Sequence, residues 1–280
     1  MTPASPIQTS ATRGTTEKPI HSSGIKWKAA ALVVLAALGF YGVFVEPYRI
    51  EVTHFDIQGA VASPLKVAHL SDLHTRGIGR REQRLLAVLD SEKPDVILIT
   101  GDTVARKNRY DGPKELYTRL HAPLGVWVVR GNWENDSPLH HERAFYQDAG
   151  VHFLLNENAE LRPDVWLIGL DDPYTGVAKL DVAMANVPAD AYKIALFHSP
   201  AFFDRIAGHV NLCLAGHTHG GQVRLPFMNP VWLPRGSGRF LAGWYQENGS
   251  QMYVNRGLGW SLLPVRFLAR PEITFITIRP

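Results

Sequence analysis

A short stretch with two histidines is the part of the sequence best suited to chemistry. It runs from Gly216 to Gln222, reads GHTHGGQ, and follows the apolar run 210–215, which is typical of a buried strand. In a turn, side chains two residues apart can aim at neighbouring points, and glycines let the backbone approach a charged group closely. Neutral imidazole is the commonest metal ligand. His217 and His219 are therefore candidate metal ligands at a strand end.

Polar side chains of the same chemical kind follow four other expected strands. Residues 65–70 are followed by Asp72 and His74, residues 95–100 by Asp102, residues 126–130 by Asn132, and residues 193–197 by His198. Several of these segments are continuous apolar runs, as in strands buried on both faces. Because open α/β folds place their sites at the ends of adjacent strands, all five groups are expected at one edge of a sheet.

The combined set of side chains predicts a centre with two metal ions. It comprises two carboxylates, one amide and four imidazoles. Seven ligands are too many for one tetrahedral ion, and they suit two ions that share a carboxylate, which has two oxygens. A nitrogen and oxygen set without thiolate favours manganese, iron or zinc over calcium. Two ions about 3.5–4 Å apart can hold both oxygens of an in-line displacement at phosphorus.

The order of these motifs resembles that of the calcineurin-like metallophosphoesterases. The chain carries D-x-H, G-D, G-N, a lone His and G-H-x-H in turn, between Val67 and Gln222. The segments YVNRGLG at 253–259, PVRF at 264–267 and PEI at 271–273 resemble a membrane-linked branch of that family. That branch includes hydrolases of the UDP-2,3-diacylglucosamine pyrophosphatase type. The resemblance implies an α/β fold with two mixed β-sheets face to face, helices outside and metals at one edge.

The resemblance also implies a role for each candidate side chain. The first ion would be held by Asp72, His74, Asp102 and His219, and the second by Asp102, Asn132, His198 and His217. By this resemblance Asp102 would be the shared ligand, and a water held between the ions would attack phosphorus. Asn132, Asp102 and His198 are the expected catalytic residues, and manganese is favoured over iron and zinc as the divalent cofactor. The expected substrate is a phosphorylated small molecule or lipid.

One position departs from the family pattern. The family usually has His after the Asn of G-N, where it is thought to protonate the leaving oxygen, but this chain has Trp133 followed by Glu134. Indole cannot give up a proton at neutral pH, and general acid catalysis contributes roughly 10²–10⁴-fold. We therefore expect a preference for pyrophosphates or activated aryl esters over alkyl esters. His140 or His141, on a helix expected after Pro138, could take the place of the missing acid. Glu134 could instead orient a ligand histidine.

Three arginines are weaker candidates for substrate contact. Arg76 and Arg80 follow the D-x-H turn, and Arg256 lies in the tail motif, so each is either a phosphate-binding group or an exposed surface charge. Trp133 is expected to form a wall of the site or a stacking face. His69 lies within a strand and is expected in the core. The single cysteine, Cys213, excludes an intrachain disulfide and is expected to be a small buried apolar residue.

The chain divides into three expected parts. Residues 1–24, rich in Ser, Thr and Pro, are expected to be a disordered tail. Residues 25–46 form a transmembrane helix or signal anchor, and residues 48–280 the phosphoesterase domain. More Lys and Arg precede the apolar run than follow it, so the domain is expected outside the cytoplasmic membrane. Further strands are expected at 165–170, 252–254 and 273–278, and helices at 80–92, 114–121, 139–149 and 201–207.

Composition limits the remaining functions. The formal net charge of the 280 residues is +3, and the basic residues form no stripe, so nucleic acid is not favoured as a partner. This mild excess of positive charge fits an anionic substrate or an anionic membrane surface. Two alternatives remain open: a non-catalytic module of the same fold, and a secreted nuclease or phosphatase whose leader is removed. The sequence leaves the oligomeric state open.

Overall fold

The computed structural model describes residues 23–230 and 232–280. The described residues divide into two units, one that ends at Gly39 and one that runs from Phe40 to Pro280. Helix α1 (Ser23–Phe40) is followed by a π-helical turn (Tyr41–Val45) and a 3₁₀ turn (Glu46–Tyr48). The segment Lys26–Tyr48 is long and apolar enough to cross a membrane. Nearly all of the expected disordered tail, 1–24, lies outside the described residues.

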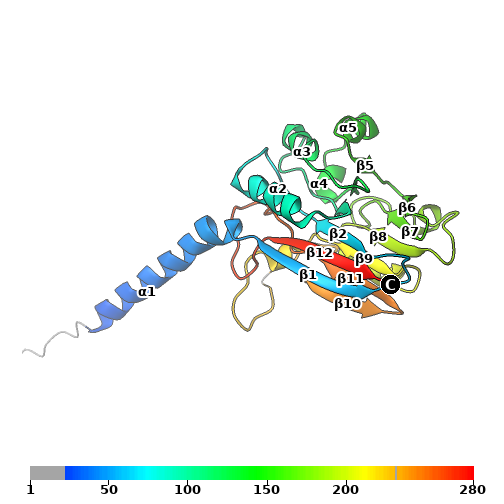
Figure 1. Ribbon diagram of the computed structural model, residues 1–280. Helices are drawn as coiled ribbons and strands as arrows, with labels where there is room; N and C mark the ends of the chain where they lie inside the picture. Colours follow the sequence, from blue (N-terminus) through cyan, green and yellow to red (C-terminus); the bar gives the residue numbers. More distant parts are fainter. Residues whose placement is uncertain (1–22, 231) are drawn as a thin grey trace, which may run out of the picture. The chain divides into compact units, whose positions relative to one another are not determined.

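Two six-stranded mixed sheets form the second unit, as the resemblance implies (Figure 1). The first sheet has the order β1-β12-β2-β3-β4-β5, and its strands are β1 (Glu51–Gln58), β12 (Glu272–Arg279), β2 (Leu65–Leu70), β3 (Val96–Ile99), β4 (Val126–Val128) and β5 (His152–Phe153). Strand β12 is antiparallel to β2 and parallel to β1, whereas β2, β3, β4 and β5 are mutually parallel. The ends of β2, β3 and β4 therefore lie at one edge.

The second sheet has the order β10-β11-β9-β8-β7-β6. Its strands are β10 (Gly243–Glu247), β11 (Ser250–Val254), β9 (Leu212–Ala215), β8 (Tyr192–Leu196), β7 (Val165–Gly169) and β6 (Glu157–Arg162). The central strands β11, β9, β8 and β7 are parallel, and the outer pairs β10–β11 and β6–β7 are antiparallel. This parallel core places the ends of β8 and β9 beside each other.

The alternation of side chains along the strands builds three apolar layers. In β2, Leu65 and Val67 point between the sheets, where they join Leu196 and Leu214 of the second sheet. Residues on the opposite face of the first sheet pack against α2 (Arg80–Glu92), α3 (Asp111–Tyr117) and α5 (Glu142–Asp148), which Figure 1 shows gathered on one side of it. A third layer covers the outer face of the second sheet, with α6 (Leu180–Ala183) and α7 (Phe203–Ile206). These layers hold the strand ends rigidly.

Several element boundaries differ from the expectations. The helix expected at 139–149 begins only at Glu142, so the expectation of a helix starting directly after Pro138 is wrong. Residues 138–139 have no regular structure, residues 140–141 form a turn, and His141 is the helix cap. A short helix, α4 (Asn132–Asn135), was not expected, and it begins directly at the G-N motif. His69 is buried and contacts Thr100 through Nε2 at 3.0 Å, which confirms it as a core residue. Cys213 is buried as expected.

Candidate metal centre

The seven candidate side chains lie at the ends of five neighbouring strands. Asp72 and His74 follow β2, Asp102 follows β3, Asn132 follows β4, His198 follows β8, and His217 and His219 follow β9. Five of these residues have a left-handed backbone: Asp72 (φ 48°), His74 (39°), Asp102 (54°), His217 (74°) and His219 (50°). This conformation costs about 1–3 kcal/mol for each residue that is not glycine, and it concentrates at functional sites. The surrounding packing therefore holds these side chains in place at a cost to stability.

The carboxylates and imidazoles form two groups, each of a size that suits one cation. Asp72, His74 and His219 make up one group and Asp102, His198 and His217 the other, and the possible ligand atoms of each lie within 4.8 Å of one another. All six residues are buried. The structure thus brings together side chains that are up to 147 positions apart in the sequence, from Asp72 to His219.

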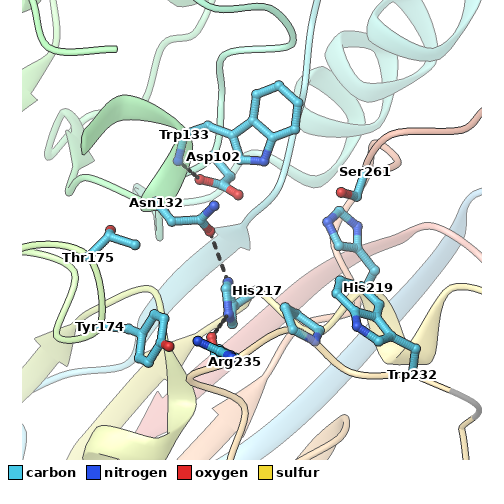
Figure 2. A pocket seen from close by; sticks show the side chains of 11 residues that line it. Asp102, Asn132, Trp133, Tyr174, Thr175, His217, His219, Trp232, Arg235 and Ser261 are labelled. Atoms are coloured by element: carbon cyan, nitrogen blue, oxygen red, sulfur yellow. Dashed lines mark hydrogen bonds between the residues drawn. The ribbon is translucent and has the colours of Figure 1, made fainter. Parts of the chain in front are cut away.

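Asp102 lies between the two groups. Its Oδ2 atom is 3.2 Å from His198 Nε2 and 3.7 Å from His74 Nε2, so it faces both. The amide oxygen of Asn132 is 3.1 Å from His198 Nε2 and 3.0 Å from His217 Nδ1, which places it within the second group. Figure 2 shows Asn132 directed at His217. One carboxylate facing two clusters is the arrangement that a shared ligand requires.

Backbone carbonyls orient three of the four imidazoles. His74 Nδ1 donates to Val104 O at 2.8 Å, and His198 Nδ1 donates to Thr100 O at 2.7 Å. His217 Nε2 donates to Arg235 O at 2.7 Å. When such a ring is neutral, its other nitrogen carries the lone pair and faces the cluster, which is how outer hydrogen bonds orient histidine ligands in metal sites.

The centre has donor atoms without partners, which is the feature that tests its fit to cations. Asp72 Oδ1 and His74 Nε2 are buried and have no hydrogen-bond partner among the described residues. Orphaned buried acceptors are costly, and two divalent ions would satisfy them. Burial lowers the pKa of His74, His217 and His219, which favours the neutral imidazole. The donor set therefore fits two divalent cations.

Electrostatics keep Asp72 ionised. Burial alone would raise the pKa of Asp72, but the imidazoles of His219, His198 and His74 together hold it below its ordinary value. Burial alone would also lower the pKa of His198, but Asp102 and Asp72 raise it well above its ordinary value. The cluster is thus a strongly coupled set of anionic and imidazole groups that a cation would neutralise.

Glu134 supports Asp102 through the backbone. Its carboxylate accepts hydrogen bonds from the N–H groups of Asp102 (2.8 Å), Thr103 (2.8 Å), Val104 (3.1 Å) and Gly131 (2.9 Å). The expectation that Glu134 orients a ligand histidine is therefore corrected: it fixes the turn after β3 instead. Burial and the Asp102 carboxylate raise the pKa of Glu134 to about 7, in spite of these hydrogen bonds.

Close contacts explain two of the glycines in the motifs. A Cβ atom on Gly131 would lie 2.2 Å from Asp102 Oδ1, so the G-N motif needs glycine beside the central carboxylate. Gly257 has a φ of 71°, and a Cβ there would lie 2.5 Å from Asp72 Cβ. In the tail segment 253–259, the backbone N–H of Leu258 donates a hydrogen bond to Ser71 O. This segment therefore buttresses the turn that carries Asp72.

A pocket of about 630 Å³ opens over the two groups (Figure 2). It is lined by Asp102, Asn132, Trp133, Tyr174, Thr175, His217, His219, Trp232, Pro234, Arg235 and Ser261. The ring of Trp133 makes an edge contact with the ring of His74, with centroids 5.0 Å apart. The backbone N–H of Trp133 donates a hydrogen bond to Asp102 Oδ1 at 2.9 Å. Trp133 thus lies at the wall of the pocket.

Two of the arginine candidates for substrate contact do not line this pocket. Arg76 lines a separate cavity with Arg106 and Arg109. Arg256 is held by Glu272 at 3.0 Å and Glu51 at 3.1 Å, so its charge is neutralised away from the pocket. Neither Arg76 nor Arg256 is among the residues that line the pocket, and their contact with substrate stays a prediction.

Three further candidates also lie outside the pocket. Arg80 lines a cavity with Tyr48. His140 and His141 are exposed and do not line the pocket, so neither is placed to replace the missing acid.

Sequence reasoning did not single out Tyr174, Trp232, Arg235 or Ser261, although all four line the pocket. Tyr174 had a usable signal, because Asp171 and Asp172 follow β7 as polar pairs follow the other strands. The remaining three lie in long loops whose path has no local pattern. Their backbone positions depend on contacts such as the one between His217 and Arg235 O.

Comparisons with known proteins agree with this geometry. The pattern of the family described as calcineurin-like phosphoesterase matches residues 65–221. The uncharacterized metallophosphoesterase YkuE of Bacillus subtilis (strain 168) is 31% identical over 271 residues, covering 90% of this chain and 94% of that protein. Phosphodiesterase YaeI of Escherichia coli (strain K12) is 28% identical over 235 residues, covering 78% and 83%. A transmembrane protein with metallophosphoesterase domain from Danio rerio is 26% identical over 293 residues, covering 94% and 65%.

The matched segment contains all seven side chains of the centre and spans more than half of the chain. The Bacillus protein is similar along almost the whole length of both chains. On these two findings, the chain belongs to the calcineurin-like phosphoesterase family and is a metallophosphoesterase, a hydrolase of phosphorus ester bonds.

Proposed function

We propose that this chain is a dinuclear-metal-dependent phosphoesterase that hydrolyses a phosphodiester or pyrophosphate bond in a lipid-linked or nucleotide-linked substrate. The observation that carries the proposal is the pair of buried groups joined by Asp102. In this assignment Asp72, His74, Asp102 and His219 would hold the first ion, and Asp102, Asn132, His198 and His217 would hold the second. Manganese, iron and zinc all suit a nitrogen and oxygen donor set without thiolate, and manganese is the metal that we propose.

When bound, two divalent ions supply Lewis acidity and lower the pKa of water at the site. The residues of the chain supply the positioning. Asp102 faces both groups, Asn132 presents its amide oxygen between His198 and His217, and Glu134 holds the Asp102 turn. The Arg235 side chain is exposed at the pocket and supplies positive charge for a substrate phosphate.

The nature of Trp133 limits the leaving group. Its indole donates a hydrogen bond but no proton at neutral pH, and the pocket offers no histidine other than His217 and His219 among its lining residues. A leaving group that is stable as an anion needs no acid, so a phosphate or an aryl oxide is favoured over an alkoxide. This argument supports a diphosphate or an activated ester as substrate. The UDP-2,3-diacylglucosamine type of diphosphate remains one candidate within that class.

The helix at Lys26–Tyr48 is proposed to anchor the domain as a single span of the cytoplasmic membrane, with the domain outside. The similarity to a transmembrane relative supports the anchor. Fusions of alkaline phosphatase and of green fluorescent protein to Pro280 test the side. Activity of the phosphatase fusion without fluorescence supports the outer side, and the reverse result would contradict it.

The test of the activity uses the full chain in detergent, stripped with a chelator and reloaded with Mn²⁺. We expect turnover of bis-p-nitrophenyl phosphate and of a UDP-sugar-like diphosphate only after reloading, and slower turnover of an alkyl phosphodiester. Metal content measured on the same samples distinguishes the alternatives. A protein that binds Mn²⁺ but hydrolyses none of the three would be a binding module, and equal turnover of the alkyl ester would contradict the leaving-group argument.

A further inference from the structure

Two loops beside the pocket expose large apolar side chains. The first loop comprises residues 222–230 and 232–234, and the second loop comprises residues 260–268. Phe227 is fully exposed, and the exposed fractions of Leu262, Leu263, Trp232 and Met228 are 82%, 66%, 61% and 58%. Between the loops lies an apolar groove of about 800 Å³. Clusters of this kind on a protein surface mark an interaction site.

Hydrogen bonds fix both loops to the end of the apolar helix. Phe267 of the second loop donates its N–H to Gln222 O at 2.9 Å and accepts from Arg224 N at 2.8 Å, which joins the two loops. Arg266 N donates to Gly42 O at 2.9 Å, and the rings of Phe267 and Tyr41 meet edge to face with centroids 6.3 Å apart. The loops are therefore attached to the residues in which the candidate membrane span ends.

The buried guanidinium of Arg266 makes the second loop rigid. It donates to the carbonyl oxygens of Ala269 at 2.8 Å and of Arg256 at 2.9 Å, and its Nε donates to Gly259 O at 2.8 Å. The loop is thus closed at its base, while Leu262 and Leu263 stay exposed at its tip. A rigid base with exposed leucines at the tip is suited to contact with an apolar phase outside the protein.

Arginines surround the same point of the chain. A cavity of about 690 Å³ is lined by Tyr48, Arg49, Ile50, Arg80, Arg81, Arg84 and Arg270. The Arg80 guanidinium lies over the Tyr48 ring, 5.6 Å from its centroid, and that ring contacts Trp260 of the second loop at 6.3 Å. Basic residues next to a span attract anionic lipid headgroups, and Tyr and Trp are enriched at the membrane interface.

From these contacts we infer that the two loops dock into the lipid bilayer around the end of the anchor. As a continuous α-helix, the segment from Lys26 to Val45 would be about 30 Å long at 1.5 Å per residue, which matches the hydrocarbon thickness. The exposed apolar side chains then enter the outer part of the hydrocarbon, and the arginines contact headgroup phosphates. Because Trp232 and Ser261 line both the groove and the pocket over the candidate metal centre, the pocket opens at the membrane surface.

The position of the pocket identifies the substrate class: a phosphoester or diphosphate of a membrane lipid, whose headgroup reaches the centre while its acyl chains stay in the bilayer. This second step rests on the proposed function, whereas the docking does not.

Fluorescence quenching tests the docking on the full chain. Cys213 is buried, so a single introduced cysteine can be labelled in the native protein. Leu262→Cys and Phe227→Cys, each carrying an NBD fluorophore, are reconstituted into vesicles that contain nitroxide-labelled phospholipid. Val182→Cys is the matched control, because Val182 is half exposed on α6, outside both loops. We expect about twofold or stronger quenching at the two loop positions and little at Val182. Equal quenching at all three positions would overturn the docking.

Kinetics test the substrate class separately. The double variant Leu262→Asp/Leu263→Asp is expected to hydrolyse a phospholipid in vesicles about tenfold more slowly, because charges at these depths are costly. Its turnover of soluble bis-p-nitrophenyl phosphate is expected to stay within about twofold of the wild type, and Val182→Asp to leave both rates unchanged. Wild-type rates on vesicle lipid in the double variant would refute delivery of the lipid by the loops, and a wild type that hydrolyses the soluble ester but no vesicle lipid would refute the lipid substrate. If no ester is hydrolysed by the wild type, the proposed function fails, and quenching still decides the docking.

Discussion

Replacing Glu134 is expected to disturb stability and metal affinity together. The carboxylate accepts hydrogen bonds from four buried backbone N–H groups. Those of Thr103 and Val104 donate to Oε1, and those of Asp102 and Gly131 donate to Oε2. Leaving one buried donor unsatisfied costs about 1–3 kcal/mol. In Glu134→Gln one oxygen becomes an NH₂ group that faces two donors, so we expect a loss of about 2–4 kcal/mol. Glu134→Ala leaves all four without a partner, and we expect a larger loss.

The metal affinity should fall because Asp102 depends on this turn. Its left-handed backbone, with a φ of 54°, is held by the bonds from Glu134 to residues 102–104. Replacing a group that orients a metal ligand typically lowers metal affinity about 10–100-fold. Urea unfolding of the chelator-treated protein measures the stability, and titration calorimetry with Mn²⁺ measures the affinity.

A core substitution separates the two effects. Leu85 is buried in α2, and Leu85→Ala is expected to cost about 2–5 kcal/mol with unchanged Mn²⁺ affinity. If Glu134→Gln unfolds and binds Mn²⁺ like the wild type, the reasoning on the Asp102 turn is wrong. If Leu85→Ala weakens Mn²⁺ binding as much as Glu134→Gln does, the affinity loss is a mere consequence of instability.

Three further predictions concern single positions. Trp133→His is expected to raise the kcat for an alkyl phosphodiester about 10²-fold while changing an aryl diester much less, and a similar rise for both esters would count against a general-acid effect. Arg256→Ala is expected to cost about 3 kcal/mol of unfolding free energy at pH 7, with the turnover of soluble esters nearly unchanged. A loss of turnover without a loss of stability would instead show that Arg256 contacts the substrate. Burial would raise the pKa of its partner Glu272, but Arg256 holds it below the ordinary value, so this cost should shrink as the pH falls below about 4.5. Burial raises the pKa of Cys213, so its thiol should react with Ellman's reagent only in urea; rapid reaction of the native protein would contradict its burial.

The central strands could be predicted from the sequence because burial on both faces leaves a continuous apolar run. The expected strand at 65–70 agrees with β2, and the apolar run 210–215 contains β9. The four strands that were not expected, β1, β5, β6 and β10, are the edges of the two sheets. Edge strands are partly exposed and mix polar with apolar residues, as in Glu157–Arg162, so they carry little periodic signal.

The candidate centre was predictable where a side chain follows a strand directly, because a strand end fixes its direction. Asp102 and Asn132 are examples, and the structure brings both to the same point. Contacts that depend on distant loops were not predictable. Arg256 looked available for a phosphate, but Glu51 and Glu272 come from strands that pair only in the folded chain. The role of Glu134 also depends on the turn after β3, whose N–H groups converge only in the tertiary structure.

The metal content and turnover of Asp102→Asn test the central claim most directly. Asparagine keeps the shape of the side chain and tolerates the left-handed backbone, but its amide has a single oxygen and cannot serve two cations as a carboxylate does. We predict that the variant folds and hydrolyses neither soluble nor lipid esters. We expect it to bind less Mn²⁺ than the wild type, which is expected to bind about two ions per chain. A variant with wild-type Mn²⁺ content and wild-type turnover would contradict the account.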